Sequence, residues 1–297
     1  MVLDITIYNK DSSSMSEIGN STIDLIVTSP PYWFLKDYDN PGQLGLNMTY
    51  QQYLNQLKLH LHECIRVLKI DSFICINIAD VRTGEYKKSG RPRIYPIQSD
   101  LINFFTREMD LDLYQHFIWE KYGVKKGEKA SLIRGSVGKG KFKEYGIAPF
   151  LYTDLLTEHI LVFRKPGNRD RGPIDQRQDE EMNRIPKEKL QEWLNPIWKI
   201  NSAKHQFHKA IFPDEVVRRL IKLFSLKNDT ILDPFCGIGT TMRVANELQR
   251  NSIGYELNQK YIMDIANTHA LELKENIYSN NSRYIKDKSS NESIEIM

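Results

Sequence analysis

The chain has 297 residues, of which 40% are hydrophobic and 27% are charged, and its formal net charge is +3. This composition is that of a globular protein with a sizeable core, and it excludes a fibrous or largely disordered chain. The cysteines Cys64, Cys75 and Cys236 are scattered and form no CxxC pair, so we expect no disulfide framework, no metal site and a reducing cytosol. Because the start of the chain lacks a signal-peptide pattern and no apolar run could span a bilayer, we expect a cytoplasmic protein.

The first half of the chain alternates strand patterns with helix patterns. The run Ile23–Thr28 is β-branched and almost continuously apolar, which is typical of a strand buried on both faces. Between Tyr50 and Leu68, leucine and isoleucine recur at helical spacing, which predicts an amphipathic helix. The other predicted elements are strands at Ile5–Tyr8, Phe73–Ile78, Phe117–Glu120 and Glu158–Arg164, and a helix at Pro96–Glu108.

The second half begins with a polar stretch and then returns to alternating elements. Residues 166–196 have few apolar side chains and no strong period, so we expect a connector with one short helix. Strands that alternate with helices predict an α/β fold with a mostly parallel central sheet and helices on both faces. The predicted elements here are strands at Thr230–Asp233 and Ser252–Glu256, and helices at Pro213–Phe224, Thr240–Leu248 and Tyr261–Leu273.

A basic stretch runs from Lys121 to Lys143. It holds eight Lys or Arg residues and, within the same bounds, only Glu128 as an acidic residue. Such a cluster can follow the phosphates of a nucleic acid, although a charge run by itself is more often a solvated loop. The basic residues are Lys121, Lys125, Lys126, Lys129, Arg134, Lys139, Lys141 and Lys143.

A strand, a tight turn and the start of a helix follow one another from Ile231 to Thr241. Asp233 ends the strand, and Gly237 and Gly239 permit positive φ and close backbone approach to a ligand. The start of the helix adds free N–H groups. Glu256 ends the next strand, where an acid can accept hydrogen bonds from both hydroxyls of a ribose.

The third glycine of the dinucleotide-binding signature is absent, because Met242 stands in its place. The motif therefore favours a ligand without a pyrophosphate. This counts against a nucleotide-dependent oxidoreductase, which remains open as an alternative of another enzyme class.

A second motif, Ser29-Pro30-Pro31-Tyr32, directly follows the strand Ile23–Thr28. Consecutive prolines fix φ and remove two N–H donors, so we expect the local carbonyls and Ser29 to point outward as acceptors. Tyr32 and Trp33 offer flat faces for a base that has been taken out of its stack. Acceptors on both N–H bonds of an exocyclic amino group would localise the nitrogen lone pair. A protein that modifies this group would otherwise need only to align the reacting atoms.

Together the two motifs resemble those of the amino-group DNA methyltransferases, the N4-cytosine and N6-adenine enzymes. The run Asp233–Thr241 is similar to their cofactor motif, and Ile253–Glu256 is similar to the motif that follows it. The resemblance implies S-adenosylmethionine as the cofactor, with Glu256 on its ribose. The segment His208–Pro213 resembles one that holds the methionine part of the cofactor, and Asp11 is expected near the adenine. The residues expected to bind the cofactor are therefore Asp11, His208, Phe212, Asp233, Phe235, Gly237, Gly239, Thr240 and Glu256.

The Ser-Pro-Pro-Tyr sequence is similar to the catalytic signature of the same family. The resemblance implies that Ser29, Pro30, Pro31 and Tyr32 contact the target base. Because the catalytic motif precedes the cofactor motif, the chain resembles the permuted β group, which has a Rossmann-like methyltransferase fold. The serine form resembles the N4-cytosine branch, so we expect methylation of cytosine N4 and keep adenine N6 as the alternative.

The resemblance also implies double-stranded DNA as the partner, and restriction-modification enzymes of this kind imply a cognate restriction endonuclease. A non-catalytic nucleic-acid-binding module and an enzyme that acts on RNA remain open as alternatives. The candidate DNA contacts are Trp33, Lys125, Lys126, Arg134, Lys139 and Lys141.

The two motifs divide the chain into segments. We expect a catalytic half at 1–120, a basic loop at 121–150 that contacts DNA, and a sheet strand within 151–165. A polar insertion at 166–196 is a candidate for target recognition. The cofactor-binding half spans 197–275, and 276–297 is expected to be a disordered tail.

Overall fold

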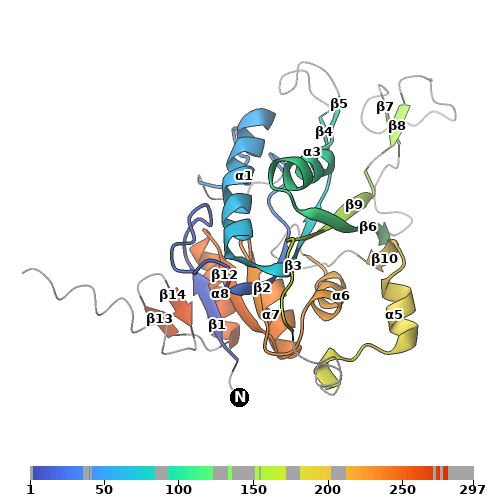
Figure 1. The fold of residues 1–297 in the computed structure, drawn as a ribbon. Helices are drawn as coiled ribbons and strands as arrows, with labels where there is room; N and C mark the ends of the chain where they lie inside the picture. The colour runs from blue at the N-terminus through green and yellow to red at the C-terminus, as the bar shows by residue number, and fades with distance from the viewer. Residues whose placement is uncertain are drawn as a thin grey trace, which may run out of the picture.

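The computed structural model describes residues 3–35, 40, 42–83, 93–122, 133–135, 151–153, 155–171, 181–201, 212–269, 272–274 and 277–279. A ten-stranded sheet crosses this part of the protein, with helices on both of its faces (Figure 1). The strands lie in the order β10-β6-β9-β3-β2-β11-β12-β1-β14-β13. Their bounds are β1 Ile5–Tyr8, β2 Ile23–Thr28, β3 Leu68–Ile78, β6 Asp112–Tyr122, β9 Thr157–Arg164, β10 Ile197–Asn201, β11 Thr230–Asp233, β12 Asn251–Tyr255, β13 Glu272–Lys274 and β14 Ile277–Ser279.

The centre of the sheet is parallel. Strands β3, β2, β11, β12 and β1 run in one direction, and Ile26 of β2 pairs with both Ile74 of β3 and Leu232 of β11. Strand β9 runs antiparallel between β3 and β6, and β14 runs antiparallel between β1 and β13. The predicted α/β architecture is therefore confirmed.

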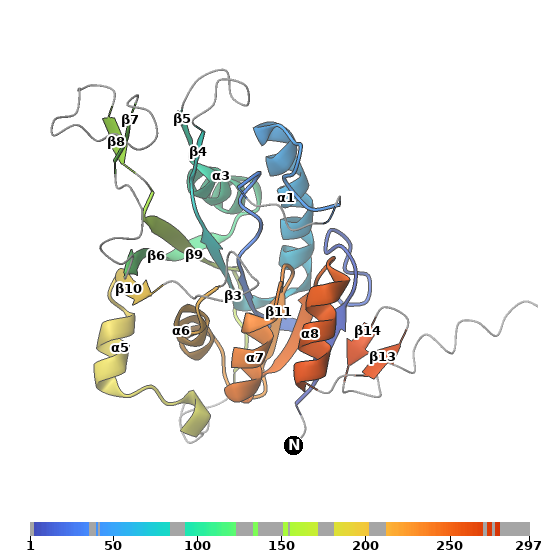
Figure 2. The same cartoon turned by 180° about the vertical axis from the view of Figure 1, so that it is seen from behind.

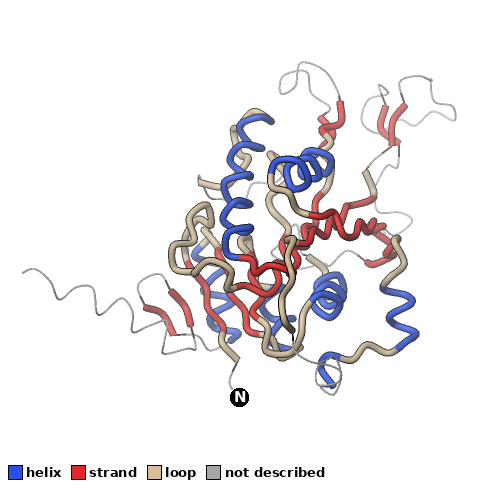
Figure 3. Tube along the Cα trace, viewed as in Figure 1, coloured by secondary structure: helices blue, strands red, loops and turns tan. Residues whose placement is uncertain are grey.

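Alternate residues of the central strands enter two separate cores. Ile26 packs with α1, α3 and the π-helical turn η1, whereas Leu25 and Val27 pack on the opposite face with α6 and α7. Helix α8 lies beside α7 (Figure 2), and helices cover either side of the strands (Figure 3). Because both faces are covered, the strands consist of nearly continuous apolar runs. The bounds are α1 Tyr50–Val67, α3 Ile97–Asn103, η1 Phe104–Glu108, α6 Asp214–Phe224, α7 Thr240–Glu247 and α8 Gln259–His269.

Helix α1 begins at a capping box. Thr49 Oγ1 accepts a hydrogen bond from the Gln52 backbone N–H at 3.3 Å, and the Thr49 N–H donates to the Gln52 side chain at 2.8 Å. The buried face of the helix carries Tyr53 and Leu57, both fully buried. The helix thus brings Tyr53 against the turn that follows β2.

Several elements differ from the sequence prediction. Strand β10 was not predicted, because it is a short edge strand whose residues alternate between exposed and buried. The helix predicted at Pro96–Glu108 is α-helical only to Asn103 and continues as η1, and the helix predicted to reach Leu273 ends at His269.

The expected disordered tail at 276–297 begins too early. Ile277–Ser279 form β14, because the edge of β1 offers unpaired backbone groups with which they hydrogen-bond. Residues 280–297 lie outside the described ranges.

Smaller elements lie around the sheet. The polar segment 166–196 contains the expected short helix, α5 (Lys187–Trp193), and a 3-10 turn, η2 (Glu181–Asn183). Two antiparallel pairs, β4 (Val81–Thr83) with β5 (Arg93–Tyr95) and β7 (Ile133–Gly135) with β8 (Leu151–Thr153), extend on one side of the molecule (Figure 1).

Within the described ranges, no helix combines the length and the apolar character needed to cross a membrane. The side chains placed there also bring together no group of three or more His, Cys, Asp or Glu that could hold a metal ion. Cys64, Cys75 and Cys236 are buried free thiols.

Candidate active site

The two sequence motifs meet at the carboxyl ends of β2 and β11, which are neighbours in the sheet. From β2 the chain continues into α1 on one face, and from β11 it continues into α7 on the other face. Such a reversal opens a crevice beyond the carboxyl ends of the strands, where ligands bind in open α/β sheets. Residues 29–32 follow β2 and residues 234–239 follow β11, so both turns border this crevice.

A hydrogen bond joins the two strand ends directly. Thr28 Oγ1 donates to Asp233 Oδ1 at 2.8 Å, and Thr241 Oγ1 donates to Asp233 Oδ2 at 2.7 Å. Asp233 Oδ1 also accepts from the Phe235 N–H at 3.1 Å. Burial raises the pKa of Asp233 to about 6, against the opposing effect of these hydrogen bonds. Asp233, named as a cofactor-binding residue, therefore shapes the turn, and a ligand would meet the backbone of that turn rather than this carboxylate.

The two glycines of the turn have different roles. Both have positive φ, 54° at Gly237 and 77° at Gly239. A Cβ atom on Gly239 would lie 2.9 Å from Ile265 Cγ1 of α8, whereas a Cβ atom on Gly237 would meet nothing within 4 Å. Gly239 thus permits close packing at the start of α7, and Gly237 leaves open space beside its backbone.

Glu256 closes the crevice at the end of β12. Its Oε2 accepts from the Gly237 N–H at 2.9 Å, and its Oε1 accepts from the Asn258 N–H at 2.8 Å. Burial raises the pKa of Glu256 to about 7. Open backbone at Gly237 beside the partly buried carboxylate of Glu256 suits a ligand that carries hydroxyl donors, such as a ribose.

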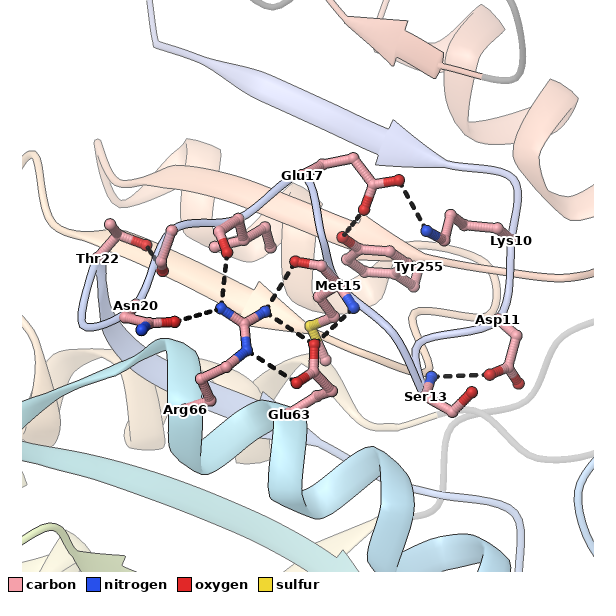
Figure 4. Close-up of polar contacts among 12 residues, drawn as sticks. Lys10, Asp11, Ser13, Met15, Glu17, Asn20, Thr22, Glu63, Arg66 and Tyr255 are labelled. Atoms are coloured by element: carbon pink, nitrogen blue, oxygen red, sulfur yellow. Dashed lines mark hydrogen bonds and ion pairs between the residues drawn. The ribbon is translucent and has the colours of Figure 1, made fainter.

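The loop that carries Asp11 is fixed to α1 by Arg66. The Arg66 guanidinium donates to Met15 O at 2.9 Å, to Ile18 O at 3.0 Å and to Asn20 Oδ1 at 2.7 Å (Figure 4). It also pairs with Glu63, whose Oε2 accepts from the Met15 N–H at 2.7 Å. These contacts hold the β1–β2 loop in one position.

Asp11 lies at the rim of the same crevice. Its Oδ2 is 3.6 Å from Nε2 of the buried His60, and the ring centroids of His60 and Phe235 are 5.0 Å apart. Burial lowers the pKa of His60. The side chain of Asp11 is 44% exposed, so it can reach a ligand at this rim.

On the opposite side of the crevice, a polar cluster surrounds the Tyr32 hydroxyl. Tyr32 donates to Glu158 Oε2 at 2.7 Å, Asn77 Nδ2 donates to the Tyr32 hydroxyl at 2.6 Å, and Ser29 Oγ lies 3.0 Å from it. Lys121 forms an ion pair with Glu158. The structure therefore brings Ser29 and Tyr32 together, as the motif predicts.

Sequence reasoning missed three members of this cluster. Asn77 is the polar residue within the apolar run Phe73–Ile78, which was a usable signal. In the sequence, Glu158 marks only the start of a strand, and Lys121 is only one member of the basic stretch. Their roles depend on the pairing of β9 with both β3 and β6, which brings distant segments side by side.

The diproline turn differs from expectation in one respect. The carbonyl of Pro31 does not point outward, because it accepts from the Tyr53 hydroxyl at 2.8 Å and from the Trp33 N–H at 3.1 Å. These inward contacts anchor the turn on α1. Ser29, which is partly exposed, can present its hydroxyl to a ligand at the crevice.

The placement of Trp33 contradicts the expectation that it contacts DNA. Trp33 is 3% exposed, and its indole N–H donates to Met48 O at 2.8 Å. Its ring packs edge-on against Tyr50 and Tyr95. Trp33 is buried because the chain turns back at this residue, where φ is 48°, and directs the ring into the core.

Of the remaining predicted site residues, some are placed in the fold and the others lie outside the described residues. Thr240 begins α7 and is buried, and Phe212 is partly buried against the core formed by α6 and α7. Arg134 lies in β7. His208, Lys125, Lys126, Lys139 and Lys141 lie outside the described residues.

The chain is similar to known DNA methylases along most of its length. A family model described as DNA methylase, N6_N4_Mtase, matches residues 23–267. The Type II methyltransferase M.MjaI of Methanocaldococcus jannaschii is 32% identical over 291 residues, and the match covers 87% of this chain and 90% of that protein.

Solved structures of DNA methyltransferases are also similar to this chain. TTHA0409 of Thermus thermophilus, described as a DNA modification methylase and solved with S-adenosyl-L-methionine, has a TM-score of 0.64 at 28% identity, covering 89% of this chain and 94% of that chain. The cytosine-N4-specific PvuII DNA methyltransferase has a TM-score of 0.62 at 18% identity, covering 89% and 85%, and this likeness shows the fold alone. These likenesses confirm the methyltransferase type of fold.

Proposed function

The chain belongs to the N6/N4 family of DNA methylases, and on that premise we propose that it transfers a methyl group to the exocyclic N4 of cytosine in duplex DNA. The enzyme depends on S-adenosylmethionine, as the family does. The observation that carries the proposal is the junction of the two motifs at one crevice, where Thr28, the residue before the Ser-Pro-Pro-Tyr motif, donates to Asp233 of the glycine motif at 2.8 Å.

The residues of the glycine turn fit this cofactor. Gly237 leaves open space beside its backbone, and Glu256 next to it offers carboxylate oxygens for the ribose hydroxyls. Asp11 and Phe235 line the same rim and would hold the adenine. His208 and Phe212 are proposed for the methionine part on the basis of the sequence motif.

When bound, S-adenosylmethionine would supply a methyl group on a positively charged sulfur, and the sulfur keeps the electron pair of the broken bond. The attacking amino nitrogen provides the electrons of the new bond and releases one proton to solvent water. The protein's part is to present that nitrogen correctly. Ser29 accepts from one N–H of the target amino group, which helps its lone pair localise. The Pro30-Pro31 turn, anchored through Tyr53, keeps Ser29 in place, so positioning lowers the barrier.

The choice of cytosine rests on the serine at position 29. The aspartate form of the motif is commoner among adenine enzymes, and the serine form resembles the N4-cytosine branch. A hydroxyl and a carboxylate can both accept from an amino group, so adenine N6 is the alternative product.

DNA contacts away from the crevice are proposed for the basic residues between 121 and 150. Lys125, Lys126, Arg134, Lys139 and Lys141 supply positive charge for phosphates. The segment 166–196, with α5, is proposed to take part in target recognition. A cognate restriction endonuclease is proposed as a partner, because relatives such as M.MjaI are Type II methyltransferases.

The experiment is methyl transfer followed by product analysis. The protein is incubated with methyl-labelled S-adenosylmethionine and either duplex DNA or structured RNA, and the nucleic acid is digested to nucleosides for mass spectrometry. We expect labelled N4-methylcytosine from DNA alone, and no label with the Ser29→Ala, Tyr32→Ala double variant. N6-methyladenine would establish the alternative, and no methylated nucleoside would reject both.

A further inference from the structure

A buried carboxylate lies behind Tyr32, and the function proposed above leaves it without a role. Glu158 is 5% exposed, and the neighbouring Asn77 is 2% exposed. Glu158 Oε1 pairs with Lys121, while Oε2 accepts from Tyr32 at 2.7 Å and from Asn77 Nδ2 at 2.5 Å. Since an ionised carboxylate can only accept hydrogen bonds, the direction of each of these contacts is fixed.

The acceptor role of Glu158 also fixes which atom donates in the hydrogen bond between Ser29 and Tyr32. Tyr32 has one hydroxyl proton, and that proton is directed at Glu158. Ser29 Oγ lies 3.0 Å from the Tyr32 hydroxyl, so in this pair Ser29 is the donor. With its own proton directed at Tyr32, the serine oxygen can offer only lone pairs to a third group.

Asn77 supports the same arrangement. Its Nδ2 faces both Tyr32 and Glu158, while its Oδ1 has no hydrogen-bond partner among the described residues. Turning the amide over would place Oδ1 against the Glu158 carboxylate, acceptor against acceptor. The carboxylate therefore holds Asn77 as a donor even though Oδ1 stays unpaired, which costs free energy in a buried position.

We propose that Glu158 is a positioning residue that makes Ser29 an acceptor, and that this lets the crevice select an exocyclic amino group against a carbonyl oxygen. The inference rests on the proposed function and adds the basis of selectivity to it. A serine hydroxyl by itself could donate to a carbonyl as easily as it accepts from an amino group. The chain of hydrogen bonds that begins at Glu158 removes the first option.

The test compares two bases that differ in this one group. Short duplexes carry the methylated site, which is located by sequencing DNA that the protein has methylated. They hold either the target base or its deaminated counterpart, uracil for cytosine or hypoxanthine for adenine. Each is placed opposite an abasic site, so that unpairing costs the same for both. Binding is measured by fluorescence anisotropy with S-adenosylhomocysteine present, so the readout does not depend on turnover. We expect the wild-type protein to prefer the amino base by about tenfold or more.

The Glu158→Gln variant reverses the hydrogen bonds. The Lys121 ammonium requires an acceptor, so the carbonyl of the new glutamine faces Lys121 and its NH₂ faces Tyr32. All proteins compared, the reference included, carry Asn77→Leu, because an Asn77 amide that turned over would offer its Oδ1 to the Tyr32 proton in place of Ser29. Tyr32 then donates to Ser29, and Ser29 donates outward. We expect the preference for the amino base to fall to about equality or below it, with a matching fall in kcat on DNA.

A second variant separates the effect of hydrogen-bond direction from the effect of the negative charge on Glu158. In Lys121→Met, Glu158→Gln, the glutamine carbonyl is free to face Tyr32 again, so the preference for the amino base is expected to return without a carboxylate. Glu120→Gln is the matched control, because Glu120 lies on the same strand as Lys121 and its side chain is 42% exposed. Thermal unfolding confirms that each protein is folded before binding is compared.

Two results overturn the proposal. One is a folded Glu158→Gln variant that keeps the wild-type preference, and the other is an equal loss in the single and the double variant. Failure of the proposed function looks different, because the wild-type protein would then yield no methylated nucleoside and show no preference between the two bases.

Discussion

Thr28 Oγ1 donates a hydrogen bond of 2.8 Å to Asp233 Oδ1, across 205 positions of sequence. The contact joins the last residue of β2 to the last residue of β11, where the catalytic turn and the cofactor turn begin. The hydrogen bond links the positions of the two turns, so we expect a substitution in one turn to affect the other.

Replacing Thr28 with valine tests this link between the two turns. Valine has nearly the same shape but no donor, so Asp233 loses a partner while it stays buried, and we expect the free energy of unfolding to fall by about 1–3 kcal/mol. The affinity for S-adenosylmethionine should fall too, because the glycine turn is less well fixed. Urea unfolding and calorimetry measure the two effects. Thr22→Val is the control, since the Thr22 hydroxyl donates to Gly19 O at an exposed position. An equal effect of both variants would contradict the role of Thr28.

Cofactor affinity should depend on the ionisation of Glu256. Its pKa is raised to about 7 by burial, so near neutral pH only part of the population carries the carboxylate that accepts from ribose hydroxyls. The affinity for S-adenosylmethionine should therefore rise with pH through this value. Calorimetric titrations across that range measure the trend, and Glu256→Gln should bind more weakly with no such trend. A trend that persists in Glu256→Gln would assign it to another group.

The same carboxyl should affect stability with the opposite sign. Its pKa is raised from 4.5 in the unfolded chain to about 7 in the fold, so the folded protein holds this proton more tightly. The contribution is fully present below pH 4.5 and is lost as pH rises through the folded pKa. The difference in free energy of unfolding between wild type and Glu256→Gln should follow that course in denaturant titrations.

The two glycines of the turn should respond differently to alanine. At Gly239 the new Cβ would lie 2.9 Å from Ile265 Cγ1 and φ is 77°, so we expect a loss of about 1–3 kcal/mol of stability. At Gly237 the Cβ meets nothing within 4 Å, so Gly237→Ala should unfold at a higher temperature than Gly239→Ala. Gly237→Ala should instead lose cofactor affinity, because its methyl group enters the open space. Equal thermal shifts would contradict this assignment.

Phosphate binding by the basic stretch should appear in the salt dependence of DNA binding. For Lys125→Ala with Lys126→Ala, the slope of log K against log salt should become shallower by about 0.9 for each phosphate that is no longer neutralised. Lys260→Ala, an exposed residue on α8, is the control and should leave the slope unchanged. An unchanged slope in the double variant would place the phosphate-binding residues elsewhere.

The core of the fold could be predicted because its strands are buried on both faces. Ile23–Thr28 reads as a strand with no knowledge of its neighbours, since a continuous apolar run needs cover on two sides. The edge strand β10 and the short strand β14, which lies between β1 and β13, lack this signal, because only tertiary pairing makes them strands. The antiparallel placement of β9 between β3 and β6 has no local signature either.

The site was predictable where its chemistry is contiguous in sequence. Ser29 with Tyr32, and Gly237 with Gly239, each lie within one short turn. Glu158 and Lys121 are far from Tyr32 in sequence, and only strand pairing brings them to its hydroxyl. The prediction for Trp33 was wrong because sequence gives the type of a side chain and not the direction in which a turn points it.

The most direct test of a shared site is the distance from the methyl carbon of bound cofactor to Ser29 Oγ in a crystal structure with S-adenosylmethionine. We predict that the ribose lies on Glu256 and that the methyl carbon faces Ser29. The space between the methyl carbon and Ser29 Oγ should admit one amino nitrogen, at about 3–3.5 Å from the methyl carbon. A cofactor seated on Glu256 with its methyl group directed away from Ser29, or too far for one base to bridge, would contradict the account.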